Sequence, residues 1–348
     1  MNRTIELHDP TFDPNKPLTM LDRFALNYIN DVRDLPFIRL TILLTLVVVP
    51  ATIWFYLPGQ FSWWIAAAYW VFVGAFMGRY ILMLHNICHR PLCKRQHRWI
   101  ANYIGWFLGP YFGETPNTYY GHHIGMHHPE NNLEDDLSCT MPYQRDSIID
   151  FLRYLGRFYL LCPFELSRYM WRRRRFRLLR KMLLGEFGFY AVAAALLCVD
   201  WQATLVLFIL PIIAARFGMM AGNWGQHAFI DPSDPGNCYR NTNTSINTRY
   251  NRACFNDGYH IGHHLDQHKH WTDMPGDFLQ NRETYAREGA IVFEGIDNFM
   301  VWGLLMLKRY DWLARFYVPL GDNQPDQSAI EELLKERTQR ITRRAAAA

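Results

Sequence analysis

The sequence lacks the cysteine patterns that build disulfide frameworks or cysteine metal sites. Its seven cysteines are odd in number and scattered, and no CxxC pair occurs among them. Residues 1–36 are mixed and polar, without the basic patch, short apolar core and cleavage site of a signal peptide. These absences predict a reducing, cytoplasmic environment for the polar part of the chain.

Internal repeats, low-complexity tracts and Gly/Ser linkers are also missing, which predicts a single domain over residues 1–348. The HExxH motif is absent as well. Its absence excludes the helix-borne zinc site of the common metalloproteases.

Long apolar runs are present, and they predict an integral membrane protein. Each run has close to the ~20 residues that a membrane-spanning helix needs. The spans are predicted at about 38–57, 62–84, 184–200 and 203–222, as two hairpins. The predicted fold is all-α, with a helical cap outside the lipid built from residues 1–37, 85–183 and 223–340. Residues 99–112 are predicted to be re-entrant or interfacial, and residues 291–307 to form an amphipathic interfacial helix.

Basic residues are missing from the two linkers inside the hairpins, residues 58–62 and 200–202. By the positive-inside rule these linkers face outward, so the cap and both termini are predicted to be cytoplasmic, at the inner membrane in a bacterium. The net charge of +4, including the run WRRRRFRLLRK at 171–181, therefore indicates orientation and lipid anchoring rather than binding to nucleic acid.

Histidines are abundant and clustered. Eleven of the fourteen fall in four short segments, HNICH, HHIGMHH, the single His227 and HIGHHLDQH. The i, i+4 spacing of His85 and His89, repeated by His123 and His127, places both rings of each pair on one face of a helix. His260, His263 and His264 share a face in the same way, and His128 adjoins His127. With an even number of spans between them, all these segments reach the same side of the membrane.

Nine convergent imidazoles exceed what one ion binds, so the cluster predicts two metals. Neutral imidazole suits Zn, Cu, Fe and Ni alike. His8, His97 and His270 are read as ordinary structural histidines, and His122 and His268 as incidental or supporting ones. Metal-bound histidines usually donate their other ring nitrogen to a carboxylate or carbonyl. The candidate supporting residues are Asn223, Asp135, Asp136, Asp257 and Asp266, although Asp257 also suits the N-cap of a helix at His260.

The motifs HNICH, HIGMHH and HIGHH resemble, in order and spacing, those of the membrane fatty acid desaturase and hydroxylase superfamily. NDGYHIGHH and NWGQH are similar to the third histidine box and the Asn-plus-His element of acyl-CoA desaturases. The resemblance implies two irons held by His85, His89, His123, His127, His128, His227, His260, His263 and His264, with Asn223 acting through water. The first box has three intervening residues where animal acyl-CoA desaturases have four, and the second has three where they have two.

The resemblance implies oxidation of a fatty acid or fatty-acyl chain by dioxygen. It also extends to the bacterial UndB-type branch, which converts free fatty acids into 1-alkenes. Desaturation and oxidative decarboxylation are both expected outcomes, with fatty-acyl or alkane hydroxylation as the alternative. Electrons are predicted to come from a separate ferredoxin, rubredoxin or cytochrome-like donor with its reductase.

A membrane metal transporter is the distant alternative. It predicts polar metal ligands along the spans. The spans hold few polar groups, chiefly Arg79, Glu186 and Arg216.

Overall fold

The computed structural model describes residues 5–321 and 325–341, so the extreme termini, predicted to be cytoplasmic, lie outside the described residues. Four helical segments within it are long and apolar enough to cross a bilayer: Val32–Tyr56, Trp63–His89, Phe176–Val199 and Trp201–Gln226. These confirm the four predicted long apolar helices. Each of them runs past its predicted range at one or both ends, because polar and aromatic residues continue the helix beyond the apolar run. The chain is an integral membrane protein.

The chain comprises two compact units. We call residues 12–125 and 166–217 the span unit, and residues 1–11, 126–165 and 218–348 the cap unit. The helices η5 (His123–His127), α7 (Ile148–Arg172) and α10 (Leu210–Gln226) run through a boundary between them. That residues 1–348 act as a single domain stays a prediction.

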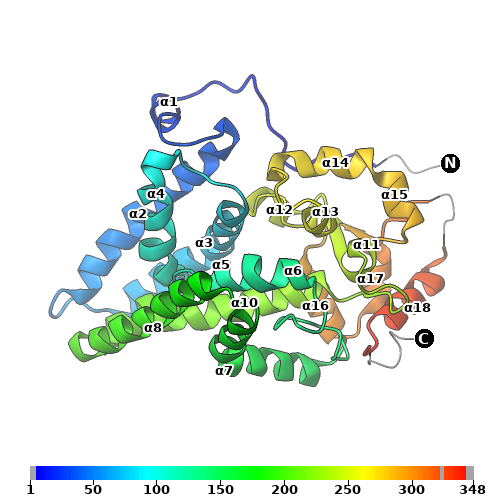
Figure 1. Ribbon diagram of the computed structural model, residues 1–348. Coiled ribbons are helices and arrows are strands. Elements are labelled where there is room, and N and C mark those ends of the chain that lie inside the picture. The colour runs from blue at the N-terminus through cyan, green and yellow to red at the C-terminus, as the bar shows by residue number, and fades with distance from the viewer. Residues whose placement is uncertain (1–4, 322–324, 342–348) are drawn as a thin grey trace. The chain divides into compact units, whose positions relative to one another are not determined.

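The span unit is built on apolar helices. Its first hairpin consists of α2 (Leu35–Tyr56) and α3 (Trp63–His89), which are in contact (Figure 1). Pro36 lies in the first turn of α2, where a missing amide hydrogen costs no helical hydrogen bond. The second hairpin is formed by α8 (Phe176–Val199), α9 (Trp201–Thr204), the π-helical η6 (Leu205–Ile209) and the start of α10.

Short helices fill the rest of the span unit, and the segment 99–112 is a broken helix of π and 3-10 turns. Trp99 and Trp106 on it are exposed, whereas Ile104 and Leu108 are buried. The short elements are α1 (Met20–Ala25), η1 (Val32–Asp34), η2 (Arg95–His97), α4 (Arg98–Asn102), η3 (Tyr103–Leu108), η4 (Gly109–Phe112) and α5 (Thr118–His122).

The cap unit is helical around a two-stranded parallel sheet in which β1 (Asn243–Ile246) pairs with β2 (Ile291–Glu294). Ile291 and Phe293 belong to one buried apolar cluster and Val292 to another, as expected when successive side chains of a strand point to opposite faces. The predicted interfacial helix over 291–307 is therefore wrong for its first part, which is a buried strand. The mostly helical fold is confirmed, with this short sheet as an addition.

The helices of the cap unit are short. Helices α17 and α18 lie against each other, at the orange and red end of the chain in Figure 1. The helices are α6 (His128–Glu130), α11 (Cys238–Asn241), α12 (Arg249–Ala253), α13 (His260–Leu265), η7 (Trp271–Asp273), α14 (Met274–Gln280), α15 (Arg282–Arg287), α16 (Asn298–Met306), α17 (Tyr310–Phe316) and α18 (Gln327–Arg337).

Candidate metal centre

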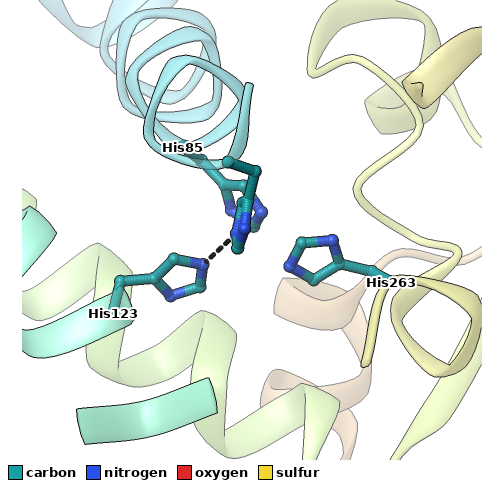
Figure 2. Close-up of side chains that lie close together, drawn as sticks. His85, His123 and His263 are labelled. Atoms are coloured by element: carbon teal, nitrogen blue, oxygen red, sulfur yellow. Dashed lines mark hydrogen bonds between the residues drawn. The ribbon is translucent and has the colours of Figure 1, made fainter. Parts of the chain in front are cut away.

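The span unit brings three histidines together. His85 and His89 occupy the last turns of α3, and their ring centroids lie 5.1 Å apart. His123 follows α5, and its Nε2 lies 2.9 Å from the Nε2 of His89. Figure 2 shows the side chains of His85 and His123 pointing toward one another. Their ring centroids lie 4.5 Å apart, with the ring planes tilted by 54°. We call these three buried residues the span histidine cluster.

A neighbouring aromatic ring supports His123. Tyr119 lies one helical turn before it and stacks on its imidazole, with ring centroids 5.3 Å apart. Sequence reasoning missed this residue, although its i, i+4 spacing from His123 was a visible signal.

The cap unit holds a cluster of four histidines, His127, His227, His260 and His264, which we call the cap histidine cluster. The Nε2 of His260 lies 3.3 Å from that of His227 and 3.1 Å from that of His264. The ring of His127 lies 5.1 Å from that of His264 and 5.4 Å from that of His227, measured between centroids. Three stretches of chain, far apart in sequence, therefore direct imidazoles to one small volume.

His128 and His263 form a further pair in the cap unit, with their Nε2 atoms 3.0 Å apart. The ring of His128 also lies 5.0 Å from that of His264, centroid to centroid. All nine histidines singled out from the sequence thus lie beside at least one other member of the set.

The outer nitrogens of two cap histidines are fixed by hydrogen bonds. His127 Nδ1 lies 2.7 Å from Asp136 Oδ2, and the other carboxylate oxygen, Oδ1, accepts hydrogen bonds from the Ser138 amide and hydroxyl. His227 Nδ1 lies 2.9 Å from the carbonyl oxygen of Asn241. Such partners set the tautomer of an imidazole and leave Nε2 as the free lone pair. The inward-facing nitrogens are therefore the ones available to a metal.

Burial favours the neutral form of two of these rings. It lowers the pKa of His227 to about 3, and the proximity of His127 acts in the same direction. Burial also lowers the pKa of His264 well below its usual value, with His128 and His127 acting in the same direction. Only a deprotonated nitrogen can bind a metal, so burial holds these two histidines in the binding form.

The spacing of the nitrogens fits metal binding. Two imidazoles bound at right angles to one ion, each about 2.1 Å away, place their nitrogens about 3 Å apart. The Nε2 separations of 2.9 Å in the span cluster and of 3.1 and 3.3 Å in the cap cluster match this arrangement. The donor set is therefore suited to two transition-metal ions.

The supporting residues proposed from the sequence differ in outcome. Asp136 is the carboxylate beside His127, whereas its neighbour Asp135 is exposed. Asn223 donates to the Ser138 carbonyl and the Tyr154 hydroxyl at 2.9 and 2.8 Å, so its amide group is fixed one turn before His227. Asp266 is exposed and ends α13.

Asp257 does not cap the helix at His260, because the N-cap position of α13 is Tyr259. That prediction is wrong. Its carboxylate instead accepts hydrogen bonds from Gln226, beside His227, and from Tyr250, and burial raises its pKa to about 7. The local sequence suits a cap, but contacts distant along the chain take the carboxylate.

The remaining histidines lie outside both clusters. His8 and His268 are exposed, His97 and His122 are half-buried, and none of them belongs to the groups described above. His270 accepts from Thr272 and caps the short helix η7, as expected for a structural histidine.

Asn241 and Ser138 were missed from the sequence. The carbonyl of Asn241 acts through the backbone, which carries no residue signal, and Ser138 lies in a loop whose path only the folded chain defines. Thr140 was also missed; its hydroxyl donates to the carbonyl of His227 at 2.8 Å.

Comparison with known proteins agrees with this geometry. Residues 62–295 match the family described as fatty acid desaturase, a range that contains every histidine of both clusters. No curated protein and no solved structure matches the chain. The matched range covers more than half of the 348 residues and carries the motifs that build the site. This chain therefore belongs to the fatty acid desaturase family.

Proposed function

We propose that this protein is a membrane di-iron enzyme that uses dioxygen to remove hydrogen from the acyl chain of a fatty acid or fatty-acyl compound. The observation that carries the proposal is the convergence of buried imidazole nitrogens in the span histidine cluster and in the cap histidine cluster. Membership of the desaturase family supports iron over the other metals that imidazole suits.

The proposal assigns two metal ions, with ligands drawn from both clusters. The π-helix η5 runs from His123 of the span cluster to His127 of the cap cluster, so a single helical segment contains both of these proposed ligands.

The proposed ligands are His85, His89, His123, His127, His128, His227, His260, His263 and His264, with Asn223, Asp257 and Asp135 as candidate water-mediated or supporting groups. His263 follows His260 by three residues, and His128 follows His127 directly. The Nε2 atoms of His128 and His263 lie 3.0 Å apart, and each would be available to bind a metal.

The iron pair, when bound, supplies the redox chemistry that activates dioxygen. The chain's own contribution is to hold the imidazoles neutral, to exclude bulk water and to position the acyl carbon. His85 and His89 lie in the last turns of α3, and His227 follows the last residue of the fourth span. We propose that these ends are cytoplasmic, so that an acyl chain reaches the metals from the lipid.

The carbon presented to the centre decides the product. A mid-chain carbon gives desaturation, whereas a carbon β to a free carboxylate gives loss of carbon dioxide and a 1-alkene. The compatibility of the histidine spacing with both branches keeps both products in the proposal. Family membership favours either of them over metal transport.

The test uses detergent-purified protein with dioxygen, a ferredoxin or rubredoxin, its reductase, and labelled free acids and acyl-CoAs. We expect two irons per chain and products that gas chromatography of the extract and headspace identifies as unsaturated acids or 1-alkenes. A His263→Ala variant should lose both products and iron, whereas His8→Ala, at an exposed position, should retain them.

One loosely bound zinc per chain with no acyl oxidation would contradict the proposal. Hydroxylated products would replace it by the hydroxylase alternative. Sustained turnover without any reductant would contradict the separate electron donor.

A further inference from the structure

A second group of buried polar residues lies in the span unit, and it contains no histidine. Glu186 on α8 and Arg216 on α10 form an ion pair of 2.6 Å, and both side chains are at least nine-tenths buried. Each oxygen of Glu186 accepts further hydrogen bonds, from Tyr190 at 2.7 Å and Thr118 at 2.8 Å, and from Thr115. Both oxygens of the Glu186 carboxylate therefore have hydrogen-bond partners besides the guanidinium, as expected for a buried charge in a membrane protein.

Glu114 is a second carboxyl at this place, and it differs from Glu186. Its side chain is 3% exposed, yet its Oε1 has no hydrogen-bond partner among residues 5–321 and 325–341. The neighbouring Gly113 has a φ of +80°, and a Cβ there would lie 2.1 Å from the carbonyl oxygen of Pro211 on α10. The loop at Gly113 therefore packs closely against α10, and this keeps Glu114 in the interior of the span unit.

The charges around Glu114 favour its neutral form. The charged groups that act on the pKa of Glu114 are Arg216 from α10 and Glu186 from α8. Tyr80 and Cys88 of α3 also lie within electrostatic range of Glu114. One guanidinium faces two carboxyls, and Glu186 already pairs with it. Burial raises the pKa of Glu114 to about 8, against the attraction of Arg216 and with the repulsion of Glu186. At neutral pH this carboxyl therefore carries a proton.

The position of Glu114 connects it to the span histidine cluster. Glu114 lies within electrostatic range of the Cys88 thiol, and Cys88 lies between His85 and His89 in the sequence of α3. Thr115 and Thr118, which follow Glu114, lead directly into α5 and His123. A carboxyl that carries a proton, has an unpartnered oxygen and borders the residues between two metal-ligand candidates is suited to donate a proton there.

We propose that Glu114 is an internal proton donor for the reduction of dioxygen at the span histidine cluster. This inference rests on the proposed function. Removal of two hydrogen atoms from an acyl chain yields two electrons and two protons, whereas reduction of dioxygen to two waters takes four of each. The electron-donor protein supplies the other two electrons, and two protons must enter from outside the substrate.

Glu114 supplies one of these protons. The O–H bond of its carboxyl group breaks, and a new O–H bond forms on an oxygen atom that leaves as water. The resulting carboxylate takes a proton from solvent before the next turnover. Its buried position next to the Glu186–Arg216 pair returns it to the neutral form, because a second unpaired negative charge there is unfavourable.

The test replaces Glu114 by Gln, which keeps the shape and removes the acidic proton. With full electron supply, we expect Glu114→Gln to lower product formation at least about tenfold and to release hydrogen peroxide in place of product. Iron content and thermal unfolding should match the wild type. Glu114→Asp should recover part of the product, and Glu283→Gln, at an exposed position on α15, should behave as the wild type.

A second readout does not depend on activity. The infrared difference spectrum, resting wild type minus Glu114→Gln, should contain the C=O band of a protonated carboxylic acid, and this band should fade as the pH rises through about 8. The difference spectrum removes the contribution of other protonated carboxyls such as Asp257. Absence of this difference band, or a variant that forms as much product per electron supplied as the wild type, would overturn the donor role alone. A wild type that oxidises no acyl substrate would overturn the proposed function and the donor role together.

Discussion

The cap histidine cluster and the group of Glu114, Glu186 and Arg216 in the span unit both consist of buried polar side chains, but they are stabilised differently. Burial favours the neutral form of His227, and the four rings of the cap cluster gather their nitrogens where they can hold a metal ion. Glu186 and Arg216 are charged and satisfy each other within the protein. The first cluster is thus built for a ligand that the chain does not contain, whereas the ion pair is complete by itself. Metal removal should therefore affect the two clusters unequally.

The largest expected effect is on bound metal, which distinguishes the cap histidine cluster from the Glu186–Arg216 ion pair. His260→Ala removes the ring that contacts both His227 and His264. We expect loss of bound metal and a fall in product formation of more than about a hundredfold, because a lost ligand exceeds the effect of a lost supporting residue. Elemental analysis and product assays measure this. Retention of two metals by the variant would show that His260 is not a ligand.

Breaking the ion pair should act on stability instead. Arg216→Met leaves the Glu186 carboxylate buried without its counter-charge and should lower the free energy of unfolding by about 3–5 kcal/mol. The double variant Arg216→Met with Glu186→Leu should recover most of this loss. Denaturant unfolding in detergent measures both. A double variant as unstable as the single one would contradict this account of the pair.

Asp136→Asn weakens the cap histidine cluster without removing a ligand candidate. The Asp136 carboxylate orients His127 at 2.7 Å, so the variant should bind metal about 10–100-fold more weakly. Competition with a chelator measures the affinity. The exposed neighbour Asp135 provides the matched control, and Asp135→Asn should leave the affinity unchanged. Equal effects of the two variants would remove the special role of Asp136.

The smallest expected effect concerns the backbone beside His227. Thr140→Val removes the hydroxyl that donates to the His227 carbonyl at 2.8 Å. We expect a loss of about 1–3 kcal/mol in unfolding free energy, since the buried carbonyl loses a partner, with two metals still bound. Loss of metal at unchanged stability would show instead that this hydrogen bond serves binding.

Much of the fold was predictable because its signals are local. Apolar runs long enough to cross a bilayer identify α2, α3, α8 and the fourth span without any contact information. The strand Ile291–Glu294 was not predicted from such local signals. It is a short apolar stretch whose partner, β1, lies more than forty residues earlier, so nothing nearby distinguishes it from a helix.

The grouping of the histidines was predictable from their spacing. Spacings such as those of His85 with His89 and of His260 with His264 place rings on one helical face, and this depends only on helix geometry. The choice of Asp136 over Asp135 was not predictable, because adjacent residues differ only in the direction that the folded loop gives them.

The sequence by itself determined the four apolar helices, the pairs of histidines on common helix faces and the membership of a family that these motifs define. Only the tertiary structure decided which nitrogen of His227 faces inward, that Asp257 turns to Gln226 rather than to its own helix, and that Glu114 lies beside Glu186 and Arg216. The physical reason is the separation along the chain over which each kind of interaction acts. Helix formation and apolar length act between near neighbours, whereas hydrogen bonds and charge pairs join residues that only folding brings together.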